Sequence, residues 1–151
     1  MKIYLASDHA GFDLKMHVKQ HLESNGYTVE DVGTYSRERA NWAEYGARAA
    51  GAVSGDPAHS MGIIVCGSGI GMSMVANKFR HVRAALCNDE YTAEMSRKHN
   101  NANVLNLGAR IISGEQAVRI VDIWLNTPFE GGRHAERLAY LSETVEKTNF
   151  K

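Results

Sequence analysis

One cysteine in this sequence stands directly before a glycine-rich loop. Cys66 follows the apolar run 61–65 and precedes glycines at positions 67, 69 and 71. Glycines at alternate positions after a buried strand let backbone N–H groups converge on an anion, and the helix that follows adds its positive N-terminal end. This pattern predicts a site for a negatively charged group beside the thiol. The alternative is a tight turn from strand to helix that binds nothing.

The common nucleotide-binding and phosphate-binding loops do not match this one. The dinucleotide fingerprint GxGxxG fails because Met72 or Met74 stands where its third glycine would be. A Walker loop is absent, and a phosphatase-type cysteine loop would need an arginine at position 72. The remaining chemistry is a covalent intermediate on the cysteine or proton abstraction next to a carbonyl. In the second case each well-placed amide would stabilise the enediolate oxyanion by roughly 3–4 kcal/mol.

The two cysteines have different surroundings in the sequence. A free thiol titrates near ~8.5, so the positive environment of the loop would help Cys66 to work as a base near neutral pH. A buried core thiol is the alternative for Cys66 and the preferred interpretation for Cys87, which follows the segment Val82-Arg-Ala-Ala-Leu86. Two cysteines without CxxC spacing do not form a disulfide framework, so both are predicted to be reduced.

Charged residues also recur at helical spacing. Arg133 and Arg137 are four residues apart, so on a helix both guanidinium groups face one side and could hold a phosphate dianion. The alternative for this pair is a solvated helix face. His17 and His21 share the same spacing and could ligate zinc, but no third ligand is evident. The neighbouring Lys15, Lys19 and Glu23 instead mark that face as exposed to solvent.

The elements that must position these residues alternate between short apolar runs and amphipathic stretches. This alternation predicts an α/β protein with a parallel sheet and crossover helices. The predicted strands are residues 3–6, 27–29, 61–65, 82–86 and 104–107. The helices expected between and after them include residues 14–22, 47–53, a stretch reaching Lys78, 89–99, 113–124 and a final helix from about residue 133 that carries Leu138, Leu141 and Val145.

The carboxyl ends of the strands are the expected place for the site. Ligands of open α/β sheets lie beyond these ends. Asp8, Cys66 and the loop 67–71 therefore share one rim if the first and third strands are neighbours, a strand order that the sequence alone does not establish.

Composition limits the class of protein further. The 151 residues fit a single domain, 1–151, and 44% hydrophobic with 23% charged residues excludes a disordered or fibrous chain. Seventeen basic residues balance seventeen acidic ones, so nothing indicates a nucleic-acid or anionic-membrane partner. No apolar run approaches the length of a membrane span, and no signal peptide opens the chain, which predicts a cytoplasmic protein.

Four segments together resemble the ribose-5-phosphate isomerase type B family. They are Ser7–Gly11, Cys66–Lys78, Asn88–Asn100 and Glu130–His134, and they span nearly the whole chain in the family's order. The resemblance implies a Rossmann-like three-layer α/β/α sandwich with a doubly wound, mainly five-stranded parallel sheet and an extra C-terminal helix. It also implies an aldose–ketose isomerase of the pentose phosphate pathway that converts D-ribose 5-phosphate and D-ribulose 5-phosphate through a cis-enediolate, without metal or cofactor.

The resemblance assigns roles to individual residues. Cys66 would be the base, Ser68 would shuttle hydroxyl protons, and His99 would help to open the furanose ring. The remaining substrate contacts would come from Asp8, Asn100 and Tyr45 at the sugar, from the loop backbone of Gly67, Gly69, Ile70 and Gly71 as an anion hole, and from His9, Arg110, Arg133 and Arg137 at the phosphate. Part of this set would come from a neighbouring subunit of a homodimer or tetramer.

Two departures affect the substrate and the branch of the family. Many relatives read Asp-Tyr-Pro-x-Tyr before the second helix, whereas this chain has Asn41-Trp42-Ala43-Glu44-Tyr45, so substrate length or stereochemistry could differ. One branch of the family lacks the cysteine and has a glutamate base just after the loop. Position 72 of this chain is Met, so the chain resembles the branch that uses the cysteine. The alternative substrates are a tetrose or hexose phosphate: erythrulose 4-phosphate, allose 6-phosphate or galactose 6-phosphate. Outside isomerases, the alternatives are a non-catalytic phosphosugar-binding module and a cysteine-loop phosphotransferase.

Overall fold

A five-stranded sheet forms the centre of the computed structural model, which describes residues 1–150. Its strands are β1 (Lys2–Ser7), β2 (Thr28–Asp31), β3 (Ser60–Cys66), β4 (Ala84–Leu86) and β5 (Val104–Gly108). They lie in the order β2-β1-β3-β5-β4, and every neighbouring pair is parallel. All seven residues of β3 are buried, as expected for a central strand covered on both faces. The predicted five-stranded parallel sheet is confirmed.

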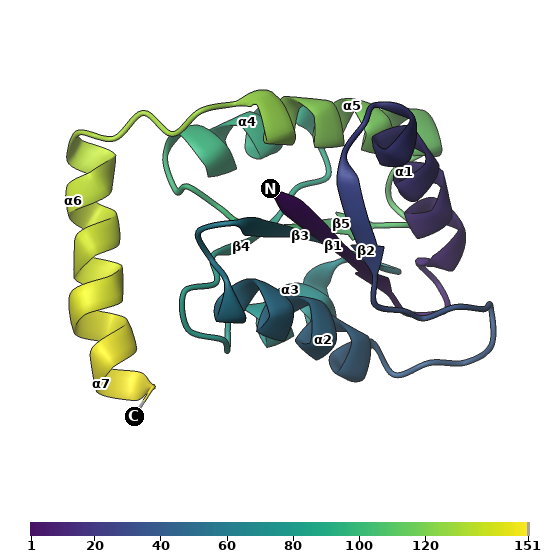
Figure 1. Ribbon diagram of the computed structural model, residues 1–151, viewed down its shortest axis with the longest axis horizontal. Helices are drawn as coiled ribbons and strands as arrows, with labels where there is room; N and C mark the ends of the chain where they lie inside the picture. The colour runs from purple at the N-terminus through teal and green to yellow at the C-terminus, as the bar shows by residue number, and fades with distance from the viewer. Residues whose placement is uncertain (151) are drawn as a thin grey trace.

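Helices cover both faces of this sheet, which gives the predicted three layers (Figure 1). One face packs against α1 (Phe12–Ser24), α4 (Glu90–Lys98) and α5 (Gly114–Asn126), and this layer contains the larger apolar cluster, with Trp124 fully buried. The other face packs against α2 (Trp42–Gly55) and α3 (Ile70–Ala76), mainly through alanines, Val53 and Met72. Small side chains on α2 allow that helix to approach the sheet closely.

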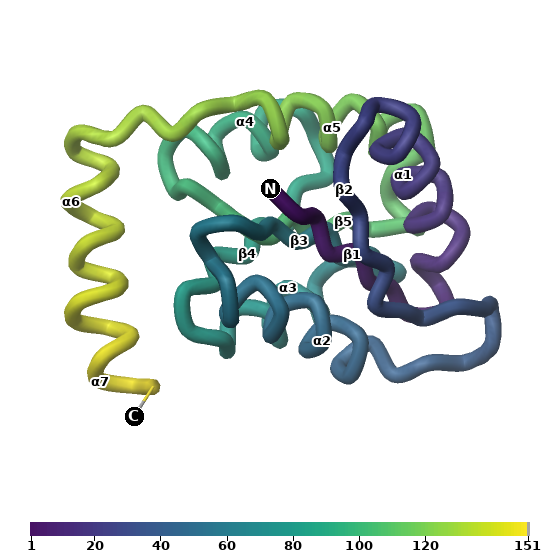
Figure 2. The backbone as a smooth tube through the Cα atoms, in the orientation of Figure 1, coloured from purple at the N-terminus to yellow at the C-terminus, as the bar shows by residue number. Residues whose placement is uncertain are grey.

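The C-terminal segment stands apart from the three layers (Figures 1 and 2). It begins as α6 (Arg133–Tyr140), continues as the π-helical η1 (Leu141–Glu146) and ends as α7 (Lys147–Asn149). The extra C-terminal helix is confirmed, but it is divided into three parts. Between this segment and the β4 edge of the sheet runs a groove of about 410 Å³, here named the C-terminal groove, with apolar walls at Leu138, Leu141 and Val145. None of the helices within residues 1–150 combines the length and apolar character needed to cross a membrane.

Some element boundaries differ from the sequence prediction. The fourth strand begins at Ala84, two residues later than predicted, because Val82 still belongs to the preceding turn, in which its N–H donates to the carbonyl of Phe79. The third helix ends at Ala76, before Lys78, and the side chain of Asn77 bridges the end of that helix to Ala84 through two hydrogen bonds.

The predicted solvent exposure of the Lys15 face of α1 is wrong. The side chain of Lys15 is 0% exposed, because its ammonium group reaches the carboxylate of Asp31 at 2.6 Å. Lys19, one turn later, is partly exposed and pairs with Glu23, as the sequence pattern indicated. Nε2 of His21 lies 2.7 Å from a carboxylate oxygen of Asp122, a hydrogen bond that links α1 to α5.

Candidate active site

The neighbouring positions of β1 and β3 place Asp8 and Cys66 at the same edge of the sheet. Ser7 is the register partner of Val65, so the next residue of each strand lies at the carboxyl end. The N–H of Asp8 donates to the carbonyl of Val65 at 3.2 Å, and its buried carboxylate accepts from the N–H of Gly11 at 3.0 Å. Only glycine fits at position 11, because a Cβ there would lie 2.3 Å from the carbonyl oxygen of Val65.

The glycine loop folds back over the sulfur of Cys66. Gly69 has a left-handed backbone with φ of 78°, and its N–H donates to Sγ of Cys66 at 3.1 Å. A side chain at position 69 would also meet Leu86 at 2.4 Å. The amide points its positive end at the sulfur, the atom that would act as a base or nucleophile. The Ser68 hydroxyl accepts from the N–H of Ile70 at 3.3 Å.

The end of β5 brings Arg110 against this loop. The N–H of Ala109 donates to the carbonyl of Cys66 at 2.8 Å, and the N–H of Arg110 donates to the carbonyl of Gly67 at 2.9 Å. A Cβ built on Gly67 would lie 3.2 Å from Nη1 of Arg110, so the guanidinium group rests on the loop. This arrangement places a permanent positive charge beside the thiol.

A pocket of about 340 Å³ opens between these segments. It is lined by Asp8, Trp42, Cys66, Gly67, Ser68, Gly71, Arg110 and Ile111. Six of these residues belong to the site that the sequence predicted, whereas Trp42 and Ile111 were missed. Trp42 was noticed only as a departure, yet its indole covers Gly71 so closely that a Cβ there would lie 3.0 Å from the ring. The sequence signal that could have indicated its place in the pocket is a large aromatic residue directly after Asn41, the N-cap of α2.

Other predicted binding residues border the pocket less directly. Tyr45 does not line it and lies in an adjacent depression with Thr34, Tyr35 and Asn41. His9 is exposed, and its Nδ1 lies 3.2 Å from the backbone nitrogen and 3.3 Å from the carbonyl oxygen of Ala40. Gly69 is buried beneath the loop, and Ile70 is 49% exposed.

The remaining predicted residues lie at the opposite edge of the sheet. The turn after β4 is at the carboxyl edge, and α4 runs back from it, so His99 and Asn100 lie near the amino end of β5. Arg133 and Arg137 are exposed on α6, which stands at the left in Figure 1, far from the turn between β1 and α1 at the right. One chain therefore does not bring this second group together with Cys66.

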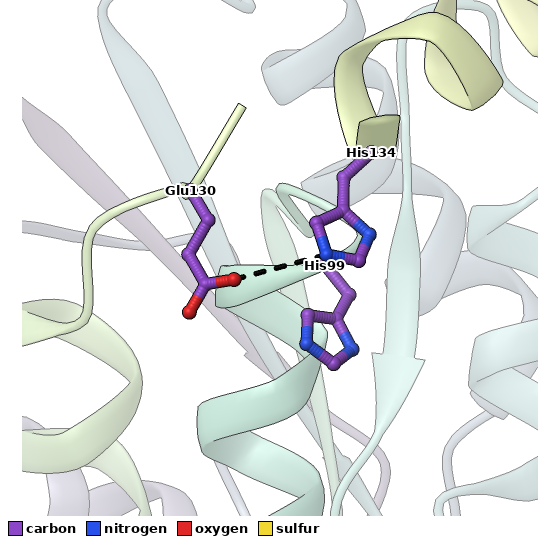
Figure 3. A group of neighbouring side chains, drawn as sticks. All are labelled: His99, Glu130 and His134. Atoms are coloured by element: carbon purple, nitrogen blue, oxygen red, sulfur yellow. Dashed lines mark ion pairs between the residues drawn. The ribbon is translucent and has the colours of Figure 1, made fainter. Parts of the chain in front are cut away.

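His99 stacks on a second histidine at this edge (Figure 3). The ring centroids of His99 and His134 are 4.2 Å apart with an interplanar angle of 13°, and Nε2 of His134 lies 3.7 Å from a Glu130 oxygen. The N–H of Glu130 donates to the carbonyl of Lys98 at 3.1 Å, which holds the segment before α6 against the end of α4. Burial, with the charges of His99 and Arg133, lowers the pKa of His134. Its neutral form is therefore favoured at neutral pH.

The same three side chains could offer ligand atoms to a metal ion, since these atoms lie within 4.8 Å of one another. Two nearly parallel rings, however, cannot both direct an in-plane lone pair at one ion without rotating. The positive charges of Arg133 and Arg137 also act on His134. The arrangement favours an anion over a cation, and the prediction of a metal-free site stands as a prediction.

Cys87 has a different environment from Cys66 and gives a first test. It is buried in the larger apolar cluster, and this burial raises the pKa of its thiol. We expect iodoacetamide at mildly alkaline pH to place its adduct on Cys66, which borders the pocket, and to leave Cys87 unmodified. Peptide mass mapping measures the two sites, and a Cys66→Ser variant is the matched control. Faster alkylation of Cys87 would contradict this assignment of the two thiols.

Comparison with known proteins connects this geometry to a family. The model of the ribose/galactose isomerase family matches residues 3–141. Ribose-5-phosphate isomerase B of Escherichia coli is 42% identical over 148 residues, which cover 98% of this chain and 99% of that protein. D-erythrulose-4-phosphate isomerase of Pectobacterium atrosepticum is 40% identical over 139 residues, 91% of each chain. The Mycoplasma genitalium ribose-5-phosphate isomerase B, solved with bound ribulose 5-phosphate, has a TM-score of 0.93 at 36% identity, with 97% of both chains covered.

Proposed function

We propose that this chain, which belongs to the ribose/galactose isomerase family, interconverts D-ribose 5-phosphate and D-ribulose 5-phosphate. It is a sugar-phosphate aldose–ketose isomerase, so the non-catalytic module and the phosphotransferase no longer apply. The observation that carries the proposal is the Cys66 sulfur, which accepts an amide N–H and borders one pocket with Asp8, Ser68 and Arg110. This is a base beside groups that can bind hydroxyls and negative charge.

The reaction follows from the positions of these groups. The Cys66 thiolate takes the proton from C2 of the open-chain aldose, and the electron pair forms the enediolate while O1 gains negative charge. Backbone N–H groups of the glycine loop stabilise this oxyanion, and Arg110 binds the phosphate at the other end of the substrate. The Ser68 hydroxyl transfers a proton from O2 to O1, and the thiol then returns its proton to C1, which yields the ketose. The thiol supplies the base and the loop supplies the positive field, so we propose no metal or cofactor in this sequence.

We further propose that each complete site contains residues of two copies in a homodimer. His99 for ring opening, Asn100 for the sugar, and Arg133 and Arg137 for the phosphate would cross from the second copy to meet Asp8, His9 and Arg110 of the first. The support is that one chain holds the two groups at opposite edges. Exposed apolar side chains on α3, with Met74 63% exposed, and the C-terminal groove offer surfaces for such contact. A tetramer would contain two such dimers.

A tetrose or hexose phosphate remains the second candidate substrate. The Pectobacterium relative is named for erythrulose 4-phosphate at nearly the same identity as the Escherichia coli relative. Trp42 lines the pocket of this chain, and the Asn41 side chain caps α2 by accepting from the N–H of Ala43 at 3.0 Å. The helix therefore begins normally without the family's Asp and Pro, while a bulkier ring borders the substrate.

A panel of sugar phosphates separates these candidates. We expect the highest kcat/KM on ribose 5-phosphate and ribulose 5-phosphate, with a lower value on erythrulose 4-phosphate, allose 6-phosphate and galactose 6-phosphate, because a pocket that orients one chain length misplaces the others. A coupled assay measures each pair, and the Cys66→Ala protein, prepared in the same way, controls for contaminating isomerase. Higher turnover on the four-carbon or six-carbon pair would replace the pentose assignment.

Three properties from the sequence stay predictions. They are the single domain 1–151, the cytoplasmic location and the place in the pentose phosphate pathway.

A further inference from the structure

One buried cation lies outside the set of residues assigned so far. Lys15, in the first turns of α1, is completely buried, and its ammonium group donates to Asp31 at 2.6 Å and to the backbone carbonyl of Thr34 at 2.5 Å. The rings of Phe12 and Tyr35 lie 5.5 Å and 5.6 Å from the ammonium nitrogen, within cation–π range. Burial lowers the pKa of this lysine, and the hydrogen bond and charge of Asp31 oppose that shift. Such a group is retained only if its partners compensate for the lost water.

The contacts of Lys15 lead directly to Asp8. Thr34, whose carbonyl Lys15 binds, donates its own N–H to the carbonyl of Ser7 at 2.8 Å, and the N–H of Ser7 donates to the carbonyl of Gly33 at 2.7 Å. Asp31 accepts from the N–H of Gly33 at 2.9 Å, so both partners of Lys15 hold the segment that pairs with Ser7. Figure 2 shows the start of α1 and the chain after β2 at the same side of the molecule.

A second path reaches Asp8 through α1 itself. The backbone N–H of Lys15 donates to the carbonyl of Gly11 at 2.8 Å, and the N–H of Gly11 donates to the Asp8 carboxylate at 3.0 Å. Lys15 therefore contacts both sides of the turn that carries Asp8. Its ammonium group binds the segment that pairs with Ser7, and its backbone N–H binds Gly11. On the third side Asp8 is bound to Val65, the residue before Cys66.

We propose that Lys15 is a positioning residue, which fixes the Asp8 carboxylate relative to the Cys66 sulfur. The inference rests on the proposed isomerase function, in which Asp8 binds a sugar oxygen. Lys15 itself lies beneath the turn, is not among the residues that line the pocket and touches no reacting atom. Its effect on catalysis is therefore indirect and passes through the geometry of one carboxylate.

The test replaces both members of the buried ion pair, Lys15 and Asp31, in one variant. Lys15→Met together with Asp31→Asn leaves no unpaired charge, and the new amide can still accept from Gly33. We expect kcat/KM to fall by about tenfold or more, mostly in kcat, because a displaced catalytic contact costs rate even when the fold persists. In an Asp8→Asn background the same double exchange should cost less than about twofold, since the residue through which Lys15 acts is already altered.

A second measurement, which does not depend on enzyme activity, follows the position of Asp8 directly. The Gly11 amide proton, bound to the Asp8 carboxylate, is followed by NMR hydrogen exchange, and we expect it to exchange faster in the Lys15→Met/Asp31→Asn protein. Lys19→Met, which removes the next lysine on α1 and its surface pair with Glu23, is the matched control and should change neither readout.

The outcomes separate the proposals. The Lys15→Met/Asp31→Asn exchange could lower kcat/KM equally in the wild-type and in the Asp8→Asn protein and leave the exchange rate of the Gly11 amide unchanged. Lys15 would then be purely structural, and the inference would be overturned. If the double exchange prevents folding, Lys15→Met alone supplies the same two readouts, because the Asp31 carboxylate is partly exposed and still accepts from the N–H of Gly33. No change in either readout overturns the inference. A wild-type protein inactive on every sugar phosphate would overturn the proposed function, while the Gly11 amide would still test the positioning of Asp8.

Discussion

Replacing Cys66 by alanine is expected to lower kcat by roughly a hundredfold to ten-thousandfold with a modest change in KM. The thiol is the only proton-accepting group proposed to reach the substrate carbon, and alanine leaves the loop, Arg110 and Asp8 in place to bind the sugar. Turnover of ribose 5-phosphate measures the loss. Proton NMR in heavy water measures it independently, because the enediolate route puts solvent deuterium on the carbon when the thiol exchanges its proton.

Cys87→Ala is the matched control for this experiment. It removes the other thiol, which is buried in the core away from the pocket, so it should lower stability and leave kcat within about twofold. If Cys66→Ala keeps wild-type kcat, or if its product still gains deuterium at the wild-type rate, another group is the base and the mechanism proposed here is wrong.

The half of the site that contains Cys66 could be predicted because its residues follow strands. The run 61–65 is apolar without interruption, and the structure buries all of β3, so the loop after it had to lie at the carboxyl edge. The adjacency of β1 and β3 could not be predicted in the same way. Strand order depends on pairing between segments far apart in the sequence, such as Ser7 with Val65, and no local pattern encodes it.

Lys15 shows why local charge patterns fail at buried sites. Its spacing with Lys19 and Glu23 is typical of a solvated helix face, and that interpretation is correct for Lys19. The partner that allows Lys15 to be buried, Asp31, lies sixteen residues away at the end of another strand. The stacking of His134 on His99 was missed for the same reason, since it depends on the backbone bond between Glu130 and Lys98.

The two separated groups of predicted residues lead to the second large effect. We expect Cys66→Ala and Arg137→Ala proteins to be nearly inactive alone at low substrate concentration, the latter because a lost phosphate contact lowers kcat/KM on the order of a hundredfold. Refolded together in equal amounts, they should recover about a quarter of wild-type activity. Half of the resulting dimers are hybrids, and each hybrid contains one site with an intact Cys66 from one copy and an intact Arg137 from the other.

The matched control mixes Cys66→Ala with the Cys66→Ala/Arg137→Ala double variant, in which every hybrid lacks the thiol, and no activity should return. Two different affinity tags isolate the hybrid and show that subunits have exchanged. If a purified hybrid of the two single variants stays inactive, each site is built by one chain, and the exposed arginines of α6 serve another purpose. Recovery would show that a chain with Cys66 at one edge and Arg137 at the other contributes to two sites at once, which explains why α6 extends beyond the three layers.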